Sequence, residues 1–223
     1  MSQDFWSYFE KEAEPNLAHR AVSFRKIFEY LDEFETPVTI VETGCLRAVG
    51  NFAGDGQSTL LFDRYVSWRG DGSHVYTVDL DPAAVEACRS AVSSNVTVTC
   101  GDSVGYLNSV AQGFIDNATQ ITLLYLDSYD VDWTYWYPSA AHHLKELAVA
   151  QRFINTDTLV VVDDCGINTT VLLDVNGVPS LVPEHINIGG KGRLVAELAA
   201  QLGIQPVFTH YQVGWTGFGA RVG

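Results

Sequence analysis

Short apolar runs alternate with amphipathic stretches along most of the chain. Five of the runs are rich in β-branched residues, and they lie at residues 38–41, 75–78, 96–99, 121–126 and 159–162. Apolar runs of this length are typical of strands that are buried on both faces of a parallel sheet. Helical periodicity occupies the stretches between them, at residues 58–66, 82–92, 104–112 and 138–153. The alternation predicts an α/β fold with right-handed crossover connections.

The chain before the first strand predicts a helical extension. Apolar residues recur at helical spacing over residues 17–31, behind Asn16, which is a favourable N-cap residue. We therefore divide the chain into an extension at residues 1–36 and a main domain at residues 37–223. Aromatic residues near the start predict either a lid or a contact in a homodimer, and they are Phe5, Trp6 and Phe9.

A small hairpin is predicted after the fifth strand. Residues 171–173 and 180–182 flank Asn176-Gly177, which is a strong turn dipeptide. The pattern therefore predicts an inserted hairpin near residues 170–183, above the sheet.

A second hairpin is predicted at the end of the chain. A helix at residues 194–202 is followed by apolar strands at residues 206–213 and 218–222, around a turn at residues 214–217. With the five earlier strands, this gives a seven-stranded sheet that is mostly parallel, with a terminal antiparallel hairpin and helices on both faces.

Composition narrows the class of protein. The chain has 223 residues, of which 47% are hydrophobic, and this suits one large domain. Its formal net charge of −14 opposes nucleic acid and membrane partners, because both are bound through clustered basic residues. The start lacks the features of a signal peptide, which predicts a cytoplasmic protein. The four cysteines are widely spaced, which favours buried thiols over a zinc site.

Carboxylates follow all five predicted parallel strands. Such acids meet at one edge of the sheet, beyond the carboxyl ends of the strands, where ligands bind in open α/β folds. Asp79 is suited to accept both hydroxyls of a ribose, and Asp102 could accept from an adenine amino group. Gly44 lets backbone approach a ligand, and the segment at residues 54–59 leads into a helix N-terminus that suits a carboxylate.

These features resemble the class I S-adenosylmethionine methyltransferases. That family has an acid and a glycine turn after the first strand, an acid ending the second strand, and Gly-Asp after the third. The resemblance implies a Rossmann-like methyltransferase sheet, although residues 45–53 lengthen the first turn in this chain. The cofactor-binding residues that we predict are Glu42, Gly44, Gly56, Ser58, Thr59, Asp79, Asp102, Ser103 and Asp127.

Three acids after the fourth and fifth strands predict a metal site. Asp127, Asp163 and Asp164 should converge, and their repulsion favours a cation among the oxygens, with Mg²⁺, Mn²⁺ or Ca²⁺ preferred by oxygen ligands. The arrangement resembles the cation-dependent O-methyltransferases of the catechol and macrocin types. That resemblance implies a metal that binds the hydroxyl of a small acceptor and promotes loss of its proton.

Candidate bases and acceptor contacts lie near the same strand ends. His142 and His143 are predicted catalytic bases, and Lys191 is a further candidate. Aromatic residues after the fourth strand could clasp a sugar, a phenol or another hydroxylated molecule, and they are Tyr129, Trp133, Tyr135, Trp136 and Tyr137.

Two other enzyme classes share parts of this pattern. A nicotinamide-dependent oxidoreductase has the same alternation but normally carries GxGxxG in the first turn, which this chain lacks. A sugar-nucleotide glycosyltransferase would use Asp79-Leu80-Asp81 to hold a metal, but this leaves the later three acids without a role. A binding module without catalytic activity is the remaining alternative.

Overall fold

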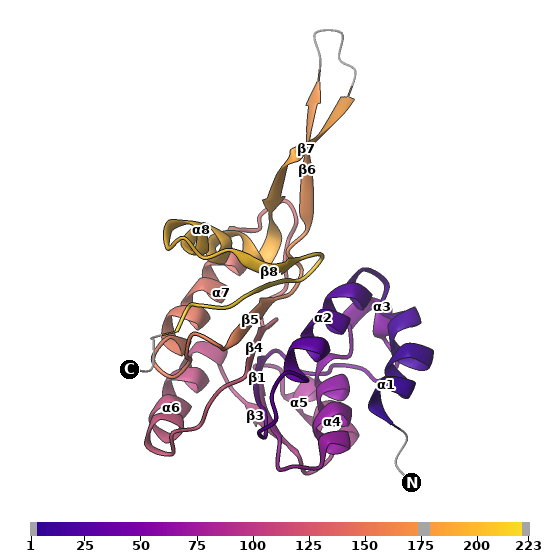
Figure 1. Ribbon diagram of the computed structural model, residues 1–223, viewed down its shortest axis with the longest axis vertical. Helices are drawn as coiled ribbons and strands as arrows, with labels where there is room; N and C mark the ends of the chain where they lie inside the picture. The colour runs from indigo at the N-terminus through magenta and orange to yellow at the C-terminus, as the bar shows by residue number, and fades with distance from the viewer. Residues whose placement is uncertain (1–3, 174–178, 220–223) are drawn as a thin grey trace.

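The computed structural model describes residues 4–173 and 179–219, and these form a seven-stranded sheet between two layers of helices (Figure 1). The strand order is β3-β2-β1-β4-β5-β9-β8. Strands β1 to β5 are parallel, while β9 pairs antiparallel with β5 and with β8. This is the Rossmann-like arrangement that the sequence predicts, so the predicted fold class is confirmed. The strands are β1 (Thr39–Thr43), β2 (His74–Asp79), β3 (Val96–Cys100), β4 (Leu123–Leu126), β5 (Leu159–Val162), β8 (Pro206–Thr209) and β9 (Val213–Trp215).

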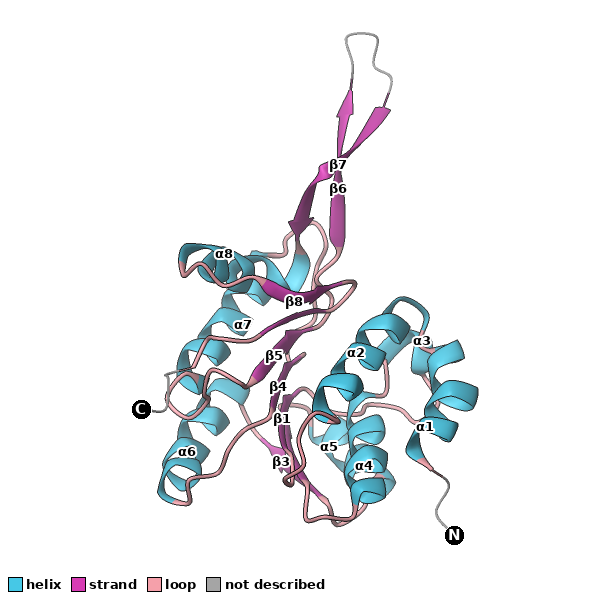
Figure 2. Ribbon diagram, in the orientation of Figure 1, coloured by secondary structure: helices cyan, strands magenta, loops and turns pink. Residues whose placement is uncertain are grey.

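Helices cover both faces of the sheet, as Figure 2 shows. One face carries the N-terminal helices together with α4 and α5, and the other carries α6, α7 and α8. Among the described residues no helix is both long enough and apolar enough to cross a bilayer. The helices are α1 (Phe5–Tyr8), α2 (Ala21–Leu31), α3 (Phe52–Asp55), α4 (Ser58–Arg69), α5 (Pro82–Ala91), α6 (Ser103–Asp116), α7 (Tyr137–Ala150) and α8 (Arg193–Gln201), with the shorter turns η1 (Phe9–Ala13), η2 (Glu14–Asn16), η3 (Ala18–Arg20) and η4 (Gly190–Gly192).

Alternation along the central strands divides the core into two clusters. Ile40 of β1 packs with the N-terminal helices, whereas its neighbour Val41 packs with α6 and α7. In β5, Val161 packs on the first side, while Val160 and Val162 pack on the second. Both faces of the sheet are therefore buried, which explains why these strands are uniformly apolar in sequence.

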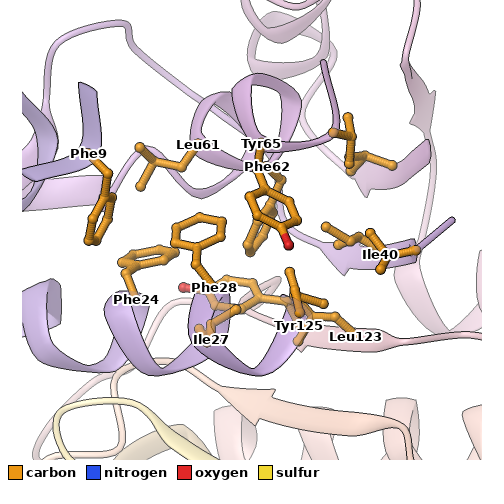
Figure 3. Close-up of a cluster of buried hydrophobic side chains, with 14 of the residues drawn as sticks. Phe9, Phe24, Ile27, Phe28, Ile40, Leu61, Phe62, Tyr65, Leu123 and Tyr125 are labelled. Atoms are coloured by element: carbon orange, nitrogen blue, oxygen red, sulfur yellow. The ribbon is translucent and has the colours of Figure 1, made fainter. Parts of the chain in front are cut away.

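The N-terminal segment is part of this core. Phe5 and Phe9 pack edge-on against Phe28, with ring centroids 4.6 and 5.4 Å apart, and Phe5 also contacts Tyr65 of α4. Figure 3 shows Phe9 beside the aromatic rings of α2 and α4. The apolar surface of Phe5 and Phe9 is thus covered within the chain, and a lid or dimer role for the extension stays a prediction.

The start of the predicted first helix is wrong. Helix α2 begins at Ala21, after a π-helical turn and two 3₁₀ turns, and Ala18 has a φ of +48°, which interrupts any regular helix. Asn16 does not cap this helix, because its side-chain amide donates back to the carbonyl of Glu12.

The turn of the terminal hairpin is also wrongly predicted. Strand β9 contains Gly214, which the sequence analysis assigns to the turn, and the chain reverses at residues 210–212 instead. Gly214 lies against the ring of Phe208, where a Cβ atom would come within 2.5 Å of a ring carbon. Close packing therefore requires this glycine. Phe218 is buried but lies outside any strand, and residues 220–222 of the predicted second strand lie outside the described residues.

The inserted hairpin is longer than predicted. Strands β6 (Ile167–Leu173) and β7 (Pro179–Ile188) pair antiparallel and extend away from the sheet, at the top of Figure 1. The predicted turn at Asn176-Gly177 lies outside the described residues.

We expect Phe9→Ala to lower the free energy of unfolding by about 3–5 kcal/mol, because it removes a fully buried ring from the aromatic cluster. Val22→Ala, at a position on α2 that is 50% exposed, should change it by less than about 0.5 kcal/mol. Urea denaturation measures both values. Equal effects of the two substitutions would contradict the assignment of the N-terminal segment to the core.

Candidate functional site

A cavity of about 350 Å³ lies at the carboxyl ends of β1, β2 and β4. The strand order reverses between β1 and β4, and this is the point at which open α/β sheets bind ligands. The loop after β1 and the start of α4 complete the wall. The lining residues are Gly44, Cys45, Leu46, Arg47, Asp55, Ser58, Asp79, Leu80, Asp81, Asp127, Ser128 and Asp130.

Gly44 allows the turn after β1 to press against the end of β4. Its φ is +84°, and a Cβ atom there would lie 2.6 Å from the carbonyl oxygen of Asp127. Only glycine satisfies both the conformation and the close approach. The predicted role of Gly44 in bringing backbone to a ligand stays a prediction, and the structure gives it this packing role in addition.

Asp79 ends β2 with its carboxylate fixed by backbone groups. Cys45 N–H donates to Oδ2 at 3.0 Å, and Asp81 N–H donates to Oδ1 at 2.9 Å. Each carboxylate oxygen can accept more than one hydrogen bond, so both keep capacity toward the cavity that Asp79 lines. The carboxylate is therefore held in a fixed orientation before any ligand arrives.

Glu42 lies behind the cavity instead of lining it. Its side chain is fully buried, and Oε2 accepts from the hydroxyl of Thr59 at 2.7 Å. Thr59 in turn accepts from Leu46 N–H at 3.0 Å, so this pair holds the loop after β1 against α4. Burial raises the pKa of Glu42 to about 7, and Oε1 has no hydrogen-bond partner among the described residues. Glu42 and Thr59 thus act on the loop in this structure, and direct cofactor contact by either stays a prediction.

The side chain of Gln57 holds the segment between β1 and α4, which includes the short helix α3. The side chain of Gln57 donates to Ala48 carbonyl at 2.7 Å and accepts from Gly50 N–H at 2.8 Å. Sequence reasoning missed this residue, because a buried glutamine ahead of a helix has no distinctive spacing. Ser58 follows it and lines the cavity, whereas Gly56 packs against the side chain of Arg20.

Asp102 and Ser103 begin α6 and are not among the lining residues. Asp102 is the N-cap and accepts from Gly105 N–H at 2.7 Å. The hydroxyl of Ser103 lies 2.9 Å from His142 Nε2. The predicted contact of Asp102 with an adenine amino group stays a prediction, as does cofactor binding by Ser103.

The three acids after β4 and β5 do converge, but with two basic side chains among them. Arg20 Nε pairs with Asp163 at 2.8 Å, and Arg20 Nη2 pairs with Asp164 at 2.8 Å. Lys191 Nζ contacts Asp127 and lies 2.9 Å from Asp164 Oδ2. The result is a buried row of alternating charges, which we call the charge chain: Asp127, Lys191, Asp164, Arg20 and Asp163.

The charge chain does not fit the predicted Mg²⁺, Mn²⁺ or Ca²⁺ site. The same acids also accept hydrogen bonds from tyrosine hydroxyls. Tyr211 donates to Asp164 at 2.7 Å, and Tyr125 donates to Asp163 at 2.9 Å. In the parts of the chain that the structure describes, no group of three or more His, Cys, Asp or Glu side chains could hold a metal ion. Like-charge repulsion among the acids is instead relieved by the ammonium and the guanidinium.

The pKa shifts within the charge chain differ between its acids. Burial raises the pKa of Asp127 well above its usual range, although Lys191 opposes that shift. Burial alone would lower the pKa of Lys191, but Asp127 and Asp164 outweigh it and raise the pKa above its usual range. Burial opposes ionisation of Asp164 as well, yet Lys191 and Tyr211 lower its pKa overall. The ammonium therefore keeps its charge here and favours the ionised form of Asp164.

The two predicted histidine bases lie in different surroundings. His142 Nε2 is 3.4 Å from the buried Glu146, which raises the pKa of His142 despite burial, and Glu146 also accepts from Ser128 Oγ at 2.6 Å. His143 is fully buried, its Nδ1 lies 2.7 Å from Ser139 carbonyl, and burial lowers its pKa to about 4. A catalytic role stays a prediction for both, although only His142 is linked to a cavity-lining residue.

Aromatic side chains stand in the segment that follows β4. The exposed ones include Tyr129, Trp133, Tyr135 and Tyr137. In the same segment, Asp130 forms an ion pair with Arg47 at 2.9 Å, at the edge of the cavity. Trp133 contacts the backbone at Gly166 and Gly190, which fixes it beside the charge chain. This segment is thus available to contact an acceptor.

Comparisons with known proteins return solved structures of low sequence identity and no family. No protein-family model matches the sequence, and no curated protein sequence matches it. A TehB-like SAM-dependent methyltransferase from Corynebacterium glutamicum is similar in structure, with 13% identity over 92% of this chain and 97% of that chain and a TM-score of 0.40. The sugar N-methyltransferase KedS8 from Streptoalloteichus has 11% identity over 97% and 94%, with a TM-score of 0.49. DesVI from Streptomyces venezuelae has 8% identity over 96% and 97%, with a TM-score of 0.46.

We expect Glu42→Gln to flatten the pH dependence of stability. Because burial raises the pKa of Glu42 from 4.5 to about 7, the folded state binds more protons than the unfolded state between these values. The free energy of unfolding of the parent protein should therefore fall as pH rises through this range, by roughly 3 kcal/mol from this group. The glutamine variant lacks this contribution.

Denaturation at pH 5, 6, 7 and 8 measures the difference between the two proteins. Glu86→Gln, on the exposed side of α5, is the control and should shift stability by less than about 0.5 kcal/mol at each pH. Parallel curves of stability against pH for the parent and the Glu42→Gln variant would refute a raised pKa of Glu42.

Proposed function

We propose that this protein is an S-adenosylmethionine-dependent methyltransferase that acts on a hydroxyl of a small molecule. The observation that carries the proposal is the charge of the cavity at the strand ends. Its described lining includes five aspartates and one arginine, which pairs with Asp130 and lies 4.0 Å from Asp55. Asp127 contacts Lys191, and the set still keeps a net negative charge. A strongly negative wall suits the sulfonium and ammonium groups of this cofactor.

The same wall disfavours the two alternative cofactors. Nicotinamide dinucleotides and sugar nucleotides both carry a diphosphate, which aspartates repel unless basic residues, helix N–H groups or a metal compensate. Asp81, the second acid of the candidate metal-binding pair, accepts from Ala83 N–H at 2.9 Å as the N-cap of α5. The start of α4 and Arg47 are then the groups left to offset a diphosphate, against five aspartates of the lining.

The residues of the cavity fit a nucleoside. Asp79 would accept hydrogen bonds from the two ribose hydroxyls, because its orientation is already fixed by Cys45 and Asp81 N–H groups. The free N–H groups at the start of α4, near Ser58, would receive the carboxylate of the cofactor. When bound, S-adenosylmethionine would supply an electrophilic methyl group.

The acceptor would bind between the end of β4 and the aromatic segment that follows it. Asp127 lines the cavity with one oxygen held by Lys191, so its other oxygen could accept the hydrogen of the acceptor hydroxyl. That contact would direct the hydroxyl oxygen toward the transferred methyl group, and such positioning accounts for much of the rate in bimolecular transfers. The released proton would pass to Asp127, which already accepts that hydrogen, and a role for His142 as base stays a prediction.

We expect calorimetric titration to show binding of S-adenosylmethionine and no binding of NAD or a uridine diphosphate sugar under the same conditions. The negative cavity wall is the physical reason for this order. Absence of binding by S-adenosylmethionine, or tighter binding of either diphosphate compound, would overturn the proposal. A metabolite extract with labelled methyl donor then identifies the acceptor.

We further expect Asp79→Asn to weaken S-adenosylmethionine binding by about 10- to 100-fold, since it removes a charged acceptor of two hydrogen bonds. Asp116→Asn, at an exposed site on the end of α6, is the matched control and should leave affinity unchanged. Thermal unfolding checks that both variants fold. Unchanged affinity in a folded Asp79→Asn protein would exclude Asp79 as the ribose contact.

A further inference from the structure

Lys191 is a fully buried lysine that lies between two strand ends. Its Nζ contacts Asp127, which follows β4, and Asp164, which follows β5. This is the point at which a cation shared by those two acids would sit. The geometry assigns Lys191 a specific role: it is a built-in counter-ion that takes the place of a divalent cation and positions Asp127 at the cavity.

The backbone around Lys191 fits closely against the end of β5. Lys191 N–H donates to Asp164 carbonyl at 3.2 Å. Gly190 has a φ of +50°, and a Cβ atom there would lie 2.0 Å from the same carbonyl oxygen. The turn η4 can approach Asp164 this closely because position 190 is a glycine. The ammonium therefore reaches the acids from a fixed backbone.

A divalent cation and Lys191 would compete for the same oxygens. Lys191 engages Asp127 Oδ1 and Asp164 Oδ2, while Arg20 engages Asp163 and the remaining oxygen of Asp164. Together the three acids and the two basic residues carry a formal charge of −1, so a dication added to this set would meet two nearby positive charges. Metal binding would require the ammonium to leave, and removal of Lys191 should create a vacancy for a metal.

Lys191 would act through Asp127 and not on the substrate itself. Its side chain is 0% exposed, whereas that of Asp127 is 16% exposed and lines the cavity. The ammonium fixes one carboxylate oxygen and leaves the other toward the cavity. Lys191 is thus a positioning residue. This second half of the inference rests on the proposed function, while the exclusion of metal does not.

The first experiment titrates the full-length protein with Mn²⁺ and follows the free ion by electron paramagnetic resonance. We expect no site in the parent protein with a Kd below about 1 mM, which is the weak end of protein cation sites. Lys191→Ala should bind one Mn²⁺ at least roughly tenfold more tightly than the parent, because two vacant carboxylates then face one another. Lys145→Ala, at an exposed position on α7, is the control and should match the parent.

Folding of the variant is monitored in the same series. Thermal unfolding of Lys191→Ala should shift upward with Mn²⁺, and Lys191→Arg, which keeps a cation, should behave as the parent. The parent titration needs no variant, so it decides the exclusion of metal even where Lys191→Ala does not fold. A parent protein that binds one Mn²⁺ as tightly as Lys191→Ala would overturn the inference.

Asp127 lines the same cavity as Asp79 and Ser58, which would hold the cofactor, so the positioning role is tested by the affinity for S-adenosylmethionine. If Lys191 acts through Asp127, Lys191→Met should weaken binding in the parent but add little in the Asp127→Asn background. Fully additive effects of the two substitutions on the affinity would overturn the positioning role of Lys191. Failure of S-adenosylmethionine to bind at all would refute the proposed function alone, because the Mn²⁺ titration still reports on the counter-ion.

Discussion

The crowding of three carboxylates at the ends of β4 and β5, one of them fully buried and two mostly buried, is the constraint on which the rest of the structure depends. An ionised carboxylate removed from water is costly unless charges and hydrogen bonds compensate it, and breaking such a buried pair typically costs about 3–5 kcal/mol. The compensating groups come from distant parts of the chain. Arg20 arrives from the N-terminal segment, Lys191 from the turn after the inserted hairpin, and Tyr211 from the terminal hairpin. Each of these segments must dock for the acids to be tolerated.

In the half of the site that would hold the cofactor, the carboxylates are stabilised in a different way. Asp79 is partly exposed and is held by two backbone N–H groups, so it needs no cation. Glu42 is fully buried with one hydroxyl donor, and burial raises its pKa toward neutrality. The two halves therefore differ in their electrostatic character. One presents a negative surface to a ligand, while the other is already neutralised from within.

Local patterns predict the sheet and the acids at its edge, because both depend on residues that are near one another in sequence. The uniformly apolar runs give β1 to β5, and the acid after each run follows from the strand boundaries. The predictions fail where contacts between residues far apart in the sequence determine the structure. Gly214 reads as a turn residue but is required by the ring of Phe208. The convergence of the acids predicts a divalent metal, but Lys191 and Arg20 take that place.

The glycines around Lys191 are the sequence feature that could have distinguished a lysine from a metal, whereas Arg20 offers no such feature. Gly189, Gly190 and Gly192 flank Lys191 in the sequence, and two of them permit close packing on Asp164 and Cys165. Arg20 lies in a predicted helix, where a basic residue normally faces solvent. Its burial depends on a partner 143 positions away, and no periodicity reports such a separation.

Arg20 also connects the two halves of the site. Its Nη1 donates to Gly54 carbonyl at 3.1 Å, and its aliphatic stem fills the space beside Gly56. The same guanidinium pairs with Asp163 and Asp164, so the loop that would hold the cofactor and the acids beside the acceptor share one side chain. A displacement of that loop would alter the pairing of the acids, and a change in the acids would move the loop. The N-terminal segment that carries Arg20 is therefore part of the proposed site as well as part of the core.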